Sequence, residues 1–138
     1  MRDVILLRLK WFAPKEVRAV IDALDEARLR LDSSAYRTVR SIAEDLIWGN
    51  AKEVIKATHE GISPHQHAYS LIANVAGDLL ETGRYHIHSG WLNPLDIGSD
   101  LLRLFDIAID EMVSVGAIDE DSGRAHKSAL LDRIAEVG

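Results

Sequence analysis

The apolar residues of this chain recur every three or four positions over most of its length, which is the spacing of an amphipathic α-helix. Between Pro14 and Leu31 they form a single stripe, and Pro14 stands where the first turn of a helix tolerates proline. A second helix is predicted to end at Gly49 and to begin at one of the capping residues Asp32, Ser33 or Ser34. The first third of the chain therefore predicts two consecutive helices.

Two start signals follow in the middle of the chain. Asn50 and Glu53 have the spacing of a capping box, and they predict a short helix that ends near Gly61. The next signal combines a capping serine, a proline at the first helical position and a glutamine as box partner, at Ser63, Pro64 and Gln66. It predicts a helix over residues 64–82, which stops at Gly83.

The last part of the chain predicts two more helices. The first begins at Ser99 or Asp100 and ends at Gly116. The second begins at Asp119, where the acidic residues that follow suit the positive end of a helix dipole, although Gly123 weakens its first turn.

Two segments lack a helical period. Residues 3–12 fit either a short strand or a helix, because their apolar run is compatible with both. Residues 84–98 contain several turn signals and form a connection longer than is usual inside a compact domain. These segments hold Trp11, Phe12, Tyr85 and Trp91, half of the large aromatic residues, so we expect them to meet, with residues 4–9 and 84–88 as a small strand pair.

Taken together, the pattern predicts an all-α protein in which residues 1–138 form a single-domain bundle of about five to six helices. A chain of 138 residues with 47% apolar residues has enough apolar surface for one core. It contains no cysteine, which excludes disulfide scaffolds, zinc ribbons, iron–sulfur clusters and thiol nucleophiles. It also has no GxSxG elbow and no glycine-rich phosphate loop, so a non-catalytic role is favoured over an enzyme.

The N-terminal residues do not predict a leader or a membrane anchor. Only Val4 to Leu7 form an uninterrupted apolar run before Arg8 and Lys10, which is too short for a signal peptide. The longest stretch without a charged residue, 61–77, contains two histidines and an asparagine and cannot span a bilayer. We therefore expect a cytoplasmic protein without a membrane partner.

Residues 64–82 and 99–115 are apolar on nearly all sides, which is unusual in a small monomer. Either they are the central helices of a well-covered monomer, or part of their surface lies in a subunit interface. We favour a homo-oligomer, with Leu104 and Ile109 as interface residues of the second helix. Tyr85 and Trp91, in the long connection, are aromatic anchors for the core or for a protein partner, and we include them in the predicted interface.

The histidines raise the alternative of a metal site in the region 59–88. His86 and His88 would lie on the same side of an extended segment and could share a divalent metal. His59 and His67 are the preferred further ligands; the other candidates are His65, Asp78 and Glu81. No HExxH motif accompanies them, so no cofactor is predicted and a divalent metal stays an alternative.

A small DNA-binding regulator is the third hypothesis. The net charge of −6 is uneven, since residues 1–60 carry +1 and residues 61–138 carry −7. The helix over residues 64–82 has no Lys or Arg and cannot read a DNA groove, whereas Arg37 and Arg40 of an earlier helix could contact phosphate. Acidic neighbours balance these arginines, so nucleic acid is disfavoured. An interaction or assembly protein is the function that we expect.

Overall fold

A computed structural model, which describes residues 14–28, 31, 33–82 and 94–137, has six α-helices in these ranges and no strand in them. The all-α helical bundle is thereby confirmed. The strand pair predicted from residues 4–9 and 84–88 lies outside the described residues. The helices, in chain order, are α2 (Lys15–Arg28), α3 (Ser34–Gly49), α4 (Ala51–His59), α5 (Pro64–Thr82), α7 (Pro94–Ser114) and α8 (Glu120–Val137).

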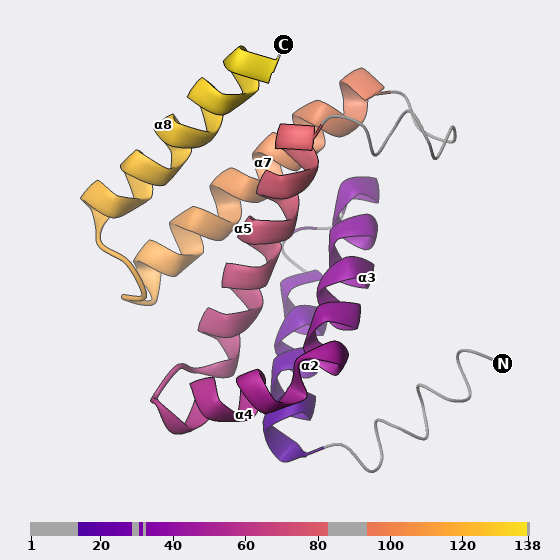
Figure 1. Ribbon diagram of the computed structural model, residues 1–138, viewed down its shortest axis with the longest axis vertical. Helices are drawn as coiled ribbons and strands as arrows, with labels where there is room; N and C mark the ends of the chain where they lie inside the picture. The colour runs from indigo at the N-terminus through magenta and orange to yellow at the C-terminus, as the bar shows by residue number, and fades with distance from the viewer. Residues whose placement is uncertain (1–13, 29–30, 32, 83–93, 138) are drawn as a thin grey trace, which may run out of the picture.

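Helix α5 occupies the centre of the bundle, where it contacts α2, α3, α7 and α8 (Figure 1). Helices α2 and α3 lie on one side of it and α8 lies on the other, next to α7. The short α4 crosses the lower end and carries the chain from α3 back to α5. The apolar surface predicted for residues 64–82 is therefore covered by other helices of the same chain.

The N-terminal caps follow the sequence closely. The Ser33 hydroxyl accepts a hydrogen bond from the Tyr36 amide at the start of α3. Ser63 and Gln66 form the predicted reciprocal box, in which each backbone N–H donates to the other side chain, at 3.0 and 3.1 Å. At the start of α8, the Asp119 carboxylate accepts from the Ser122 amide at 2.6 Å. This bond is the main reason that the pKa of Asp119 is lowered.

Two glycines end helices where sequence analysis places them. Gly61 and Gly116 have φ values of +96° and +77°, a conformation that other residues adopt only with strain. In each case the residue after the glycine donates to a carbonyl five residues earlier, Ile62 to Ala57 and Ala117 to Met112. These bonds satisfy carbonyl groups that the helix end would otherwise leave without a donor.

One predicted cap and one predicted helix start were wrong, although α4 begins directly after Asn50 as expected. Asn50 does not cap α4 with its side chain, because both its backbone N–H and its Nδ2 donate to the Leu46 carbonyl at the end of α3. Helix α7 begins at Pro94 and not at Ser99 or Asp100. Proline suits a turn and the first position of a helix equally, and Gly98 inside the helix did not prevent it from forming.

The core is built mainly from α2, α3, α5 and α7. Tyr36 is its largest fully buried side chain, and its hydroxyl donates to the Leu24 carbonyl of α2. Burial raises the pKa of Tyr36 to about 12, which keeps the phenol protonated and able to donate. On α5, the polar residues Asn74 and Asp78 are exposed to solvent, while Ile72 and Ala76 are completely buried.

Helix α8 is held by a narrow stripe of its surface. Gly123 is buried against α7, and a Cβ atom built on it would lie 2.9 Å from Val113 Cγ2 and 3.4 Å from Ile109 Cγ2. Leu130 is its only large side chain among the described core residues. The glycine that weakens the first turn of α8 is thus what permits this end of the helix to approach α7.

We predict that Gly123→Ala destabilises the protein by about 1 kcal/mol, because the added methyl group meets the stiff Val113 side chain. Gly98→Ala is the matched control, since a Cβ there meets nothing within 4 Å. It should stabilise α7 by about 0.5–1 kcal/mol through helix propensity alone. Urea unfolding followed by circular dichroism measures both changes, and a stabilising Gly123→Ala would contradict the close approach of α8 to α7.

Candidate functional site

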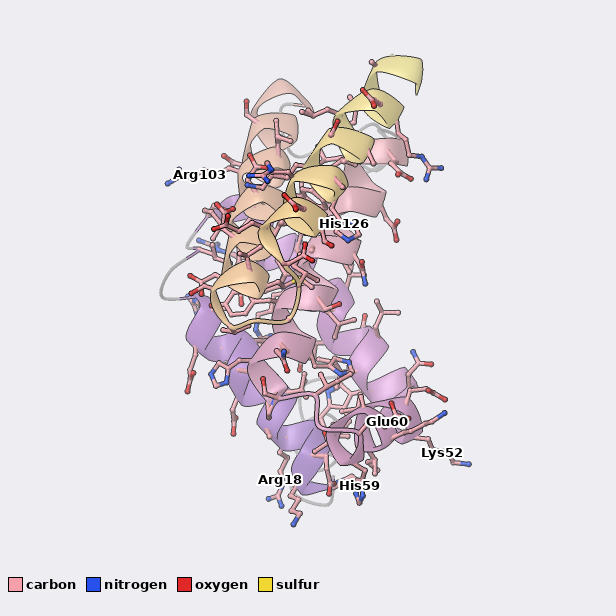
Figure 2. The ribbon with its side chains drawn as sticks, turned by 90° about the vertical axis from the view of Figure 1, so that its left-hand side faces the viewer. Arg18, Lys52, His59, Glu60, Arg103 and His126 are labelled. Atoms are coloured by element: carbon pink, nitrogen blue, oxygen red, sulfur yellow. The ribbon has the colours of Figure 1, made fainter. Side chains whose placement is uncertain are left out.

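The histidines of the predicted metal site that are described here do not share a site with one another. His59 ends α4, and its Nε2 atom is 4.0 Å from Glu16 Oε1 of α2, with a side chain that is 70% exposed. Figure 2 shows His59 at the lower end of the molecule, near Arg18 and Glu60. His67 lies half-buried in the first turn of α5, where burial lowers its pKa.

Two of the other ligand candidates, His65 and Glu81, pair with side chains of neighbouring helices, and Asp78 is exposed on α5. His65 Nε2 is 2.6 Å from Glu26 Oε2 and links α5 to α2. Glu81 Oε1 is 3.2 Å from Arg133 Nε and links α5 to α8. Within the described ranges, no three His, Asp or Glu side chains are grouped so that they could hold a metal ion. His86 and His88 lie outside these ranges, so the metal site stays a prediction.

The predicted interface residues have different locations. Leu104 and Ile109 are 2% and 4% exposed and belong to the core of the single chain. Tyr85 and Trp91 lie outside the described residues. If α7 contacts a second copy, the contact must use the side of the helix that the core leaves accessible.

That side borders α8 and forms what we call the α7–α8 edge: Leu102, Ile109, Asp110 and Val113 of α7 with Glu120, Arg124, Lys127 and Leu131 of α8. Most of these residues surround a hollow of about 310 Å³ between the two helices. Lys127 Nζ contacts Asp110 Oδ1 at 2.7 Å beside it. Leu131, one turn after Lys127, is 51% exposed.

Leu131 has no signal in the sequence that separates it from a core residue, because α8 has no regular apolar stripe. The spacing of Leu102, Ile109 and Val113, seven and four residues apart, places them along one line of α7. On α8, Arg124, Lys127 and Leu131 form a similar line. Ile109 and Val113 of the first line and Arg124 and Lys127 of the second border the hollow, so the edge has an apolar floor and charged flanks there.

Arg40, a candidate for phosphate contact in the DNA hypothesis, has acidic partners within the chain. Its Nε donates to Asp25 Oδ1 of α2 at 3.2 Å, its Nη2 contacts the same oxygen, and its Nη1 pairs with Glu44. These contacts raise the pKa of Arg40 in spite of its partial burial. Only the pair with Glu44, four residues on, has a signal in the sequence. Arg40 therefore has less capacity for duplex DNA than its sequence suggests.

Comparisons with known proteins add no relative to this picture: neither family models nor curated proteins nor solved structures match the chain. In the part of the chain that the structure describes, no helix has the length and apolarity needed to cross a membrane. Among the described residues, the α7–α8 edge and the surroundings of Arg40 each border a hollow, and these two surfaces are the candidate functional sites.

We predict that His67 makes the protein less stable at mildly acidic pH. Because burial lowers its folded-state pKa, the unfolded chain takes up a proton near the ordinary value of about 6.5 while the folded ring still resists it. Stability should therefore fall as the pH drops below that value, and His67→Gln should reduce the slope by up to about one proton per molecule. Urea unfolding at a series of pH values measures the slope.

The exposed His126 of α8 provides the control. His126→Gln changes the histidine count equally and should leave the slope as it is in the wild type. An unchanged slope in His67→Gln would show that the burial of this ring does not affect stability.

Proposed function

We propose that this protein is a non-catalytic helical interaction protein that self-associates through the α7–α8 edge. The observation that carries the proposal is the exposed Leu131, 51% accessible, beside a hollow whose floor includes Ile109 and Val113. The choice of a non-catalytic role rests on the sequence, which has no cysteine, no nucleophile elbow and no phosphate loop.

Two apolar residues that α7 contributes to this edge are not used by the core, whereas Ile109 is a core residue. Leu102 and Val113 are partly exposed, and neither belongs to the core or to the apolar side chains that pack against it. Single exposed leucines are common on any protein and need no explanation. Here, however, the partly exposed Val113 lines the hollow from α7, and the exposed Leu131 follows one turn after Lys127, which lines it from α8. Neighbouring exposed apolar residues are a feature of docking surfaces.

The charges of the edge favour a second copy as its partner. Asp110 and Glu120 are acidic and Arg124 and Lys127 are basic, so both signs occur on the same small surface. In a two-fold contact, a residue i of one copy meets a residue j of the other and j meets i, so a surface with both signs can pair acidic with basic side chains. A purely acidic edge would repel its own copy.

The assembly would use the same helix that the sequence predicts, but different residues of it. Leu104 belongs to the core and is expected to act on folding rather than on association. The surplus apolar surface of residues 64–82 has its explanation in the contacts of α5 with four other helices. Self-association is therefore a property of the α7–α8 edge and not of the central helix.

We predict that the wild-type protein is dimeric at micromolar concentration and that Leu131→Asp converts it to a monomer. A charge at this position would have to be desolvated in the interface. Because Leu131 is exposed in the single chain, the monomer should stay folded, with its free energy of unfolding changed by less than about 1 kcal/mol. Light scattering gives the mass, and circular dichroism confirms the fold.

Two variants make the result specific. Leu46→Asp changes another exposed leucine, 41% accessible on α3, and should leave the dimer intact. Leu104→Asp buries an unpaired charge in the core and should cost more than about 4 kcal/mol. A wild type with a monomer mass at all concentrations would disprove self-association, and a Leu131→Asp dimer would place the interface elsewhere.

A further inference from the structure

Helices α2 and α3 enclose a second hollow, of about 540 Å³, whose lining is dominated by arginine. Asp25 and Arg28 come from α2, while α3 supplies Tyr36, Arg37, Arg40, Ser41 and Glu44. This is the size range of small-molecule sites. The hollow is separate from the α7–α8 edge, since the two share no lining residue.

The charges of this hollow are not balanced. Three guanidinium groups face two carboxylates, which leaves a net charge of +1 in a protein whose overall charge is −6. Both carboxylates are taken up by Arg40, since Asp25 and Glu44 each pair with it. Arg28 and Arg37 are exposed and make no ion pair with a described residue. The excess positive charge therefore belongs to these two side chains at the rim.

The donors around the hollow suit an oxyanion. Guanidinium groups bind phosphate through paired N–H donors, and the Ser41 hydroxyl, which also lines the hollow, can donate as well. Arg40 is fixed by its two carboxylates, so its remaining N–H groups have a defined direction. Tyr36 closes the floor, with its hydroxyl committed to the Leu24 carbonyl.

From this geometry we infer that the α2–α3 hollow binds the phosphate group of a small phosphate monoester, with Arg28 and Arg37 as its principal ligands and Ser41 as a further donor. The volume of the hollow exceeds what a phosphate alone needs, so the organic part of the ester would occupy the remainder. Glu44 limits the affinity, because it holds a guanidinium that would otherwise face the ligand.

The test is a titration with inorganic phosphate and, separately, with phenyl phosphate, at constant ionic strength in chloride buffer. The Nε–Hε signals of the arginines in proton–nitrogen correlation spectra report binding. We expect saturable shifts for both probes and binding of the ester at least about threefold tighter than that of the inorganic ion, since only the ester fills the hollow. Equal affinities would overturn the small-molecule assignment.

Charge-matched variants locate the site. Arg37→Gln should weaken phosphate binding at least about fivefold, and Arg28→Gln with Arg37→Gln should abolish it. Arg18→Gln is the control, because Arg18 lies on the same helix about 15 Å from Arg28 and points to solvent at the lower end of the molecule (Figure 2). Equal losses in Arg18→Gln and Arg37→Gln would mean that only the general charge of the protein matters, and the assignment would be wrong.

Glu44→Gln provides a test that damage to the fold cannot imitate. The substitution removes one negative charge and releases Nη1 of Arg40, so phosphate should bind about fivefold more tightly. Unchanged or weaker binding in a folded Glu44→Gln protein would contradict the site. Duplex DNA that binds with a steep salt dependence, and is lost in Arg37→Gln while both small probes fail, would replace the inference with a nucleic-acid surface.

Discussion

The packing of α5 against α7 is the contact on which the rest of this bundle depends. Small residues lie at this contact: Gly77 is next to Phe105, where an added Cβ would make ordinary van der Waals contact with the ring at 3.5 Å, and Ala73 and Ala76 are buried on the same helix. Helices with small residues at their contact approach closely, and the dispersion energy of many short contacts then becomes large. Helices α2, α3 and α8 also contact α5, so α5 is the central helix around which the bundle is arranged.

The ion pairs between helices lie on the outside of this core. His65 with Glu26, Lys127 with Asp110 and Arg133 with Glu81 each join two helices through side chains that are partly or largely exposed. Exposed ion pairs of this kind contribute about 0–1 kcal/mol, so they orient the helices more than they stabilise them. The pair of Asp25 with Arg40 is different in its consequence, because it leaves Arg28 and Arg37 as the excess charge of a hollow.

Helix α8 has a defined position although few of its side chains are buried. Gly123 and Leu130 are its buried contacts, and most of its described side chains face solvent. This arrangement leaves a hollow along α7 and an exposed leucine beside it, which are the features that support the assembly proposal. A more apolar α8 would have closed that hollow within the single chain.

Local chemistry is what the sequence by itself determined. The caps at Ser33, Ser63 and Asp119 and the glycine stops at 61 and 116 were all predictable, since each depends on residues within one turn. The helical class followed from the period of the apolar residues. The tertiary structure decided the choices that local chemistry leaves open. Asn50 had two helix ends within reach and bonded to the earlier one.

The division of apolar residues between core and surface was likewise a tertiary outcome. Leu104 and Leu131 are both leucines of predicted helices, yet one is in the core and the other is half exposed. Arg40 pairs with Asp25, fifteen residues earlier in the chain, because α2 and α3 pack together. No spacing in the sequence predicts this pair. The period of the apolar residues indicates which face of a helix is apolar. Only the positions of the other helices decide what covers that face.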